Sequence, residues 1–127
     1  MQNYNPEVPP NPAEWLAIDE QSRIRIVEKY HRNARVKVPN LKGHAIYHAI
    51  VENQIAEGLD SVLRAMTRLI NQGLSRHEAL HAVGSCVADY VFEVLSSEDK
   101  DSAGTAQNRY DAAVERLTAM EWRRKYP

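Results

Sequence analysis

Four of the five histidines in this chain form two pairs whose spacing suits metal binding. His44 and His48 are four residues apart, and His77 and His81 have the same spacing within the pentapeptide His-Glu-Ala-Leu-His. Residues four positions apart lie about one turn apart on the same face of an α-helix, so each pair can present two imidazoles to one ion. We therefore predict a metal site made of these four histidines.

Both pairs are predicted to face the core of a helical protein. Tyr47 and Val51 fall on the helix face of the first pair, while Leu80 and Gly84 fall on the face of the second. A buried imidazole nitrogen without a partner costs on the order of 1–3 kcal/mol. One shared metal ion would satisfy several such nitrogens together, and Gly84 would leave room for a ligand or for a closely packed helix.

The predicted helix order brings the two pairs together. Helices at 40–57, 59–72 and 75–95 would run up, down and up, so the first and third would be parallel neighbours. His44 would then lie level with His77, and the second histidine of each pair would lie one turn higher. Four imidazoles on helices packed about 8–10 Å apart can converge on one point.

Three further residues have more than one reading. Glu52, one turn after His48, can reach the ion or orient a histidine. His31 is interpreted as an interhelical hydrogen-bonding residue, with membership of the site as the alternative. Glu78 is the candidate catalytic residue, a general base for metal-bound water, but its position three residues after Ser75 also suits a capping box.

The segment from His77 to Gly84 resembles the H-E-x-x-H-x-x-G helix of zincin metallopeptidases. The resemblance implies that His77 and His81 bind zinc and that Glu78 is the general base. The long-signature branch of these enzymes has a third histidine three residues after the glycine, where this chain has Val87. A third ligand would therefore come from another part of the chain.

A longer stretch, from His44 to Leu95, resembles an uncharacterised family of small bacterial helical proteins, a domain of unknown function. The resemblance implies that the two histidine motifs belong to one unit, and it brings no known activity. It rests on four motifs, His44-x-x-x-His48, Glu52-Asn53-Gln54, Glu57-Gly58-Leu59 and Arg76-His77-Glu78-Ala79-Leu80-His81.

Composition excludes several classes of partner. The 127 residues include 16 basic and 17 acidic ones, with a pI near 6.5, so no positive field favours nucleic acid or an anionic membrane. No run of about 18 apolar residues and no signal-like N-terminus is evident, so the cytoplasm is the expected location. The lone Cys86 makes no internal disulfide and is interpreted as a small helix residue.

The predicted fold is an all-α bundle of about five helices with an extended proline-rich N-terminal arm. The arm is assigned to residues 1–11 and a single helical domain to residues 12–127. A short helical turn should open at Asn11-Pro12, and a loop is expected from Ser96 to Thr105. The main helices are predicted at 20–33, 40–57, 59–72, 75–95 and 106–124.

The sequence favours a small protein that binds one transition metal through His44, His48, His77 and His81. Zinc is the expected ion, with nickel or iron as alternatives, because imidazole suits all three. With Glu78 as base, the site would belong to a metal-dependent hydrolase. The alternative is a non-catalytic interaction module with a structural histidine core, whose arm or C-terminal helix contacts a protein partner or a second copy of the chain.

Overall fold

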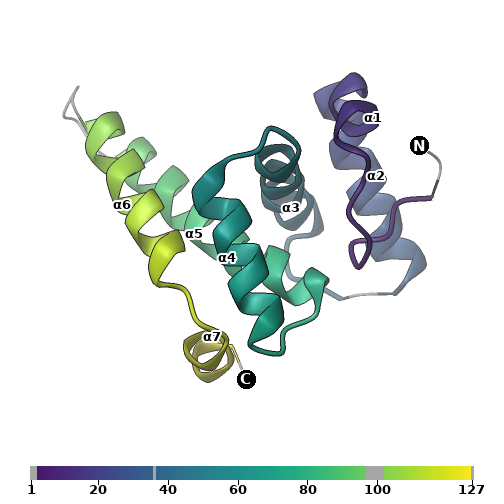
Figure 1. Ribbon diagram of the computed structural model, residues 1–127. Helices are drawn as coiled ribbons and strands as arrows, with labels where there is room; N and C mark the ends of the chain where they lie inside the picture. Colours follow the sequence, from purple (N-terminus) through teal and green to yellow (C-terminus); the bar gives the residue numbers. More distant parts are fainter. Residues whose placement is uncertain (1–2, 36, 97–101, 127) are drawn as a thin grey trace.

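The computed structural model describes residues 3–35, 37–96 and 102–126, and within these ranges the chain forms seven helices and no strand (Figure 1). The prediction of an all-α fold is confirmed, but the number of helices exceeds the predicted five. The helices are α1 (Pro12–Ala17), α2 (Glu20–Asn33), α3 (Leu41–Ala56), α4 (Asp60–Asn71), α5 (Arg76–Ser96), α6 (Ser102–Arg116) and α7 (Ala119–Lys125).

Local signals set most of the helix ends. The side chain of Asp19 accepts a hydrogen bond from the backbone of Ser22 at the start of α2, and Asn40 caps α3 in the same way. Gly58 and Gly73, with φ values of 77° and 105°, follow α3 and α4. The bounds of α2 to α5 therefore lie within one residue of the predicted ones.

The single helix predicted over 106–124 is wrong, because two helices, α6 and α7, occupy this region. Arg68 of α4 donates hydrogen bonds to the backbone carbonyls of Val114 and Leu117, at the end of α6. The side chain of Thr118 then caps α7. The Arg68 contacts come from another helix, but the Thr118-x-x-Glu121 spacing is a local signal of a helix start that the prediction of one long helix overlooked.

The beginning of α6 also differs from the prediction. A loop was expected over 96–105, but α6 begins at Ser102. Residues 97–101 of that loop lie outside the described residues.

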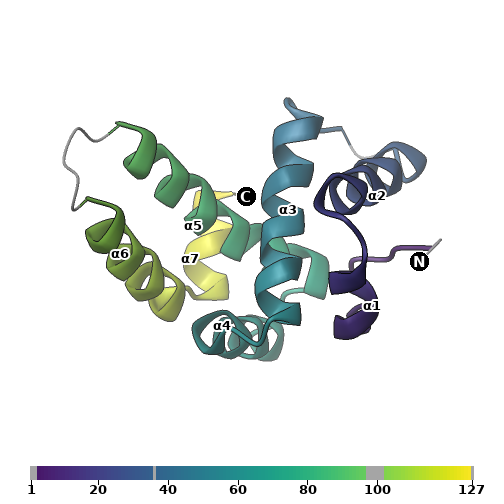
Figure 2. The ribbon, with the colours of Figure 1, turned by 90° about the horizontal axis from the view of Figure 1, so that it is seen from above.

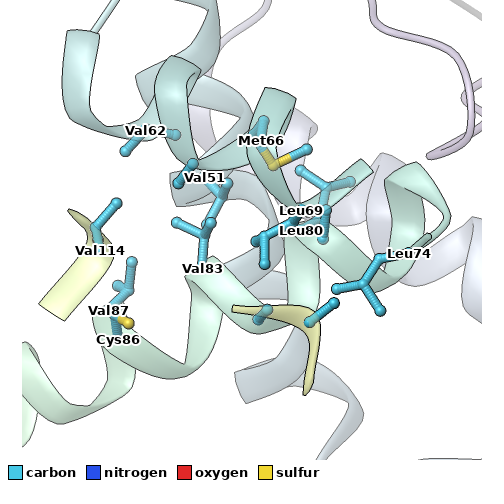
Figure 3. Close-up of a cluster of buried hydrophobic side chains, with 14 of the residues drawn as sticks. Val51, Val62, Met66, Leu69, Leu74, Leu80, Val83, Cys86, Val87 and Val114 are labelled. Carbon is cyan, nitrogen blue, oxygen red and sulfur yellow. The ribbon is translucent and has the colours of Figure 1, made fainter. Parts of the chain in front are cut away.

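Helix α3 lies between two groups of helices and contributes to two hydrophobic clusters (Figure 2). Val51 belongs to the larger cluster, which α3 shares with α4, α5, α6 and α7 (Figure 3). Ala45 and Ala49 belong to the smaller cluster, with Trp15 of α1 and Val27 of α2. Since α3 is buried on two sides, polar residues on it must find partners inside the protein.

The N-terminal arm lies on the helical part of the chain. Tyr4 and Pro6 are both buried. The ring of Tyr4 packs against Trp15 and Tyr30, with centroid separations of 5.6 and 6.1 Å. The division into an arm at 1–11 and a domain at 12–127 stays a prediction, but the arm contributes a side chain to the core.

Helix α5 is the one described helix that is long and apolar enough to cross a membrane by length and composition. Core helices pass the same test, and α5 buries Leu80, Val83 and Val87 in the larger cluster. Its apolar pattern continues to the C-terminal end, where Phe92 and Leu95 are exposed. The helical periodicity places Leu95 on the same face as His77, but that face is buried only in the earlier turns of α5.

Two leucines test where the core lies. Leu69 is fully buried and Leu95 is 81% exposed. We expect Leu69→Ala to lower the free energy of unfolding by about 2–5 kcal/mol, because it leaves a cavity in the core. The matched control Leu95→Ala should change it by about 0.5 kcal/mol or less. Urea unfolding of metal-free protein measures both, and equal losses would contradict this core.

Candidate metal centre

The five histidines of the chain gather at the junction of three helices. His31 comes from α2, His44 and His48 from α3, and His77 and His81 from α5. Each side chain offers one nitrogen, and these five nitrogens all lie within 4.8 Å of one another. The group, called the histidine cluster below, could hold a metal ion.

The cluster forms with a different register from the predicted one. The ring centroid of His44 lies 4.5 Å from that of His81, and the centroid of His48 lies 5.2 Å from that of His77. The predicted level pairing is therefore wrong for His44, which meets His81, whereas His48 lies near both His77 and His81, whose ring centroid is 5.7 Å from that of His48. In Figure 2, α5 runs obliquely to α3 instead of parallel to it, so the first histidine of one pair meets the second of the other.

His31 is a full member of the cluster, although sequence reasoning gave its membership only as an alternative. It is completely buried, and its Nδ1–H donates to the backbone carbonyl of Val27 at 2.9 Å. This hydrogen bond leaves the lone pair on Nε2, the nitrogen that faces His44 at 3.1 Å. The signal in the sequence was the position of His31 one turn after Val27 on a buried face.

Tyr4 determines which nitrogen of His48 is free. Its hydroxyl donates its single hydrogen to Oε2 of Glu52 at 2.5 Å. The Tyr4 oxygen, 2.7 Å from Nε2 of His48, must therefore accept the hydrogen of that nitrogen. His48 then carries its lone pair on Nδ1. No spacing rule connects residue 4 with residue 48, so sequence reasoning missed Tyr4.

Glu52 does orient a histidine, but it acts through Tyr4. Its carboxylate is 2% exposed and receives two hydrogen bonds from Arg76, at 2.7 and 2.9 Å. The same guanidinium donates to the carbonyl of Pro6 at 2.8 Å. Arm, α3 and α5 are therefore joined by one buried ionic network whose last member, His48, belongs to the cluster.

A second contact fixes the arm at the start of α5. A carboxylate oxygen of Glu7 accepts a hydrogen bond from the backbone amide of His77 at 2.9 Å. A negative charge at this end of a helix interacts favourably with the unpaired amides and with the helix dipole. The arm therefore holds His77 through its backbone and His48 through its ring.

The nitrogens at the centre of the cluster cannot all be satisfied by one another. Nε2 of His44 lies 3.1 Å from Nε2 of His31 and 3.0 Å from Nε2 of His81. A ring nitrogen carries either one hydrogen or one in-plane lone pair, so His44 can make one full hydrogen bond to these two neighbours. A cation between the three nitrogens would remove the conflict.

Two other nitrogens have no partner among the described residues. They are Nδ1 of His48 and Nε2 of His77, and both are buried. Leaving a buried polar atom without a hydrogen bond costs on the order of 1–3 kcal/mol. Because both atoms belong to rings of the cluster, a metal ion would satisfy them with the ligand type that transition metals take from histidine.

The surroundings keep His44, His48, His77 and His81 neutral, which is the form that binds metal. Burial, reinforced by neighbouring imidazoles, lowers the pKa of His77 to about 4 and that of His81 to about 3. The same causes lower the pKa of His44, and they lower that of His48 well below its ordinary value. At neutral pH these four rings are therefore available as ligands.

Glu78 is not brought to the histidines. Its side chain is exposed and accepts a hydrogen bond from the backbone amide of Ser75 at 3.2 Å. The hydroxyl of Ser75 accepts in return from the amide of Glu78 at 3.1 Å, which completes a capping box. The geometry thus agrees with the capping interpretation of this residue and places no zincin-type base at the cluster.

Comparison with known proteins adds no relative: no family model, no curated protein and no solved structure matched the chain.

The lowered pKa values predict how the metal-free protein responds to acid. Histidines of the unfolded chain take up protons near pH 6.5, whereas folded His77 and His81 do so only near pH 4 and 3. Because the unfolded state binds more protons in between, the free energy of unfolding should fall as pH drops below 6.5. Urea unfolding between pH 7.5 and about 5, above the ordinary carboxylate range, measures the slope.

A histidine variant tests whether the buried imidazoles cause the pH dependence of the free energy of unfolding. His81→Gln removes one of the titrating groups, so its stability should change less over the same pH range. Constant stability of the wild-type chain across this range would contradict neutral buried imidazoles.

Proposed function

We propose that this protein binds one divalent transition-metal ion through the five imidazoles of the histidine cluster. The observation that carries the proposal is that one nitrogen from each of five imidazoles lies within 4.8 Å of the others, and that two nitrogens of these rings are buried without a partner among the described residues. Hydrogen bonds to Val27 and Tyr4 place the lone pair of His31 on Nε2, which faces His44, and that of His48 on the unpartnered Nδ1. An ion in the cluster would satisfy nitrogens that the protein cannot satisfy itself.

The spacing of the nitrogens supports a crowded coordination shell. With metal–nitrogen bonds of about 2.1 Å, ligand nitrogens lie about 3.0 Å apart at a right angle and about 3.4 Å apart at the tetrahedral angle. The separations from His44 to His31 and His81 are 3.1 and 3.0 Å. No two donor atoms are more than 4.8 Å apart, against about 4.2 Å for opposite ligands, so small side-chain movements would close the shell.

Five donors, of which His44 lies from His31 and from His81 at the spacing of ligands at a right angle, favour iron(II) or nickel(II), which accept five or six ligands, over zinc, which usually takes four. The sequence-based expectation of zinc on His44, His48, His77 and His81 stays as the alternative. The two differ in the role of His31, which is a ligand in the first case and a hydrogen-bonding neighbour in the second.

The proposal covers binding and does not include hydrolysis. A hydrolase of the zincin type needs a carboxylate that can take a proton from water beside the metal. Glu78 is engaged in its capping box, and Glu52 is held by Arg76 and Tyr4. The other candidate, an interaction module with a metal-free histidine core, predicts protein that carries no bound ion.

Metal content is the first test. Protein purified without a histidine tag should carry up to one transition-metal ion per chain by elemental analysis, and metal-free protein should take up one equivalent. His48→Ala and His31→Ala should each weaken binding by more than the roughly 10–100-fold typical of a lost orienting partner. Competition with a chromophoric chelator measures the affinities.

The matched control is Glu78→Gln, which keeps a side chain of the same size outside the cluster and should keep the metal affinity. A loss of no more than about 100-fold in His31→Ala would favour the four-histidine zinc site, in which His31 is a hydrogen-bonding neighbour. Protein that neither contains nor takes up metal would overturn the proposal and favour the interaction module.

Two tyrosines test the orienting network. Tyr4→Phe keeps the ring but removes the hydroxyl that accepts from His48, so metal affinity should fall by roughly 10–100-fold. Tyr110 is also buried, and its hydroxyl donates to Gln54 in the larger hydrophobic cluster. Tyr110→Phe therefore loses a comparable hydrogen bond away from the cluster, and its metal affinity should stay unchanged. Equal effects of the two variants would rule out a specific role for Tyr4.

A further inference from the structure

A cavity of about 340 Å³ lies directly beside the histidine cluster. His44, His48 and His81 form part of its wall, so an ion held by the cluster would border the cavity. The volume falls within the range of about 300–1,000 Å³ that is usual for small-molecule sites. No residue of the N-terminal arm lines the cavity.

The rest of the wall suits an apolar, flat molecule. Three aromatic side chains line the cavity, Tyr47 of α3, Trp122 of α7 and Tyr126, which directly follows α7, together with Leu80 and Ala88 of α5. The lining contains no aspartate, glutamate, lysine or arginine. Aromatic rings bury a large area against such walls and pack favourably face to edge or offset.

Gly84 adds to the room in the cavity. It lines the cavity, and a Cβ atom built on it would lie 3.9 Å from Tyr47 and 4.0 Å from Val51. These are ordinary contacts, so the packing of α5 against α3 does not require glycine at this position. The missing side chain leaves space that a ligand can use.

The charge of a divalent ion in the cluster favours a ligand that carries a negative charge. Neutral imidazoles leave the two positive charges of a divalent ion uncompensated, and Glu52, the buried carboxylate in the ionic network, is already paired with Arg76. A buried charge without a counter-charge is unfavourable. An anionic oxygen entering from the cavity would complete the shell and compensate the ion.

We propose that the cavity binds a small aromatic monoanion, with its carboxylate or phenolate oxygen on the metal and its ring against Tyr47, Trp122 and Tyr126. This inference rests on the proposed metal site. The metal supplies the attraction for the charged oxygen, and the apolar wall selects molecules that carry a ring. Simple anions lack the ring, and neutral aromatic molecules lack the charge.

Benzoate is the probe, with acetate as the anion without a ring and benzyl alcohol as the ring without a charge. The full chain is loaded with cobalt(II), whose visible absorption reports on its ligands. Benzoate should change this spectrum and bind roughly tenfold or more tightly than acetate, because its ring is buried. Benzyl alcohol should leave the spectrum unchanged, and metal-free protein should bind benzoate at least tenfold more weakly.

Substitutions that add side-chain volume test whether benzoate binds in this cavity. Ala88→Leu fills part of the cavity and should weaken benzoate binding by tenfold or more, while the affinity for cobalt stays unchanged. The matched control is Ala112→Leu, in a separate cavity of about 260 Å³ between α5 and α6, which should change neither. Gly84→Ala fits the contacts of α5 and should give a smaller loss in the same direction.

The outcomes separate this inference from the metal site. A chain that binds cobalt but prefers benzoate over acetate by less than threefold overturns the inference and leaves the metal site standing. Benzoate affinity that ignores Ala88→Leu, or that is equal in metal-free protein, also overturns it. A chain that binds no metal overturns both proposals.

Discussion

The junction of α2, α3 and α5 is constrained by the requirement that a buried imidazole nitrogen must have a partner. Five rings lie at this junction, beside helices that also form two hydrophobic clusters. Apolar side chains at these positions would need no hydrogen-bond partner. Burial keeps four of these rings neutral, and two of their nitrogens have no partner among the described residues. An ion held by the cluster would satisfy these nitrogens, so metal binding would be coupled to folding through the same atoms.

The buried ionic network contributes more to the orientation of His48 and of the N-terminal arm than to the free energy of unfolding. Removing Glu52 and Arg76 from water is costly, and their mutual attraction offsets that cost only with good geometry. Here two hydrogen bonds join Glu52 and Arg76. The Tyr4 hydroxyl donates a further hydrogen bond to Glu52, and the Pro6 carbonyl accepts one from Arg76. The result is a single allowed tautomer for His48 and a fixed path for the arm across the start of α5.

Features that depend on residues close together in the sequence could be predicted, whereas features that depend on contacts between distant residues could not. Histidine pairs and helix ends depend on neighbours within four residues, so the bounds of α3 and α5 and the inward faces of both pairs could be predicted. The oblique crossing of these helices depends on packing of whole faces, so the level pairing failed for His44. Tyr4, and the contacts of Arg68 at the end of α6, involve partners more than 40 residues away.

The donor set explains why a cavity beside the cluster matters chemically. Cysteine or carboxylate ligands cancel part of the charge of an ion, whereas imidazoles only lend electron pairs and leave that charge in place. The arm contacts His48 and the backbone of His77, and the cavity lies beside His44, His48 and His81. An ion in the cluster would therefore face a cavity whose aromatic walls carry no charge of their own. Electrostatic attraction to the ion would then hold the anionic oxygen of a ligand, while burial against the aromatic wall would hold its ring.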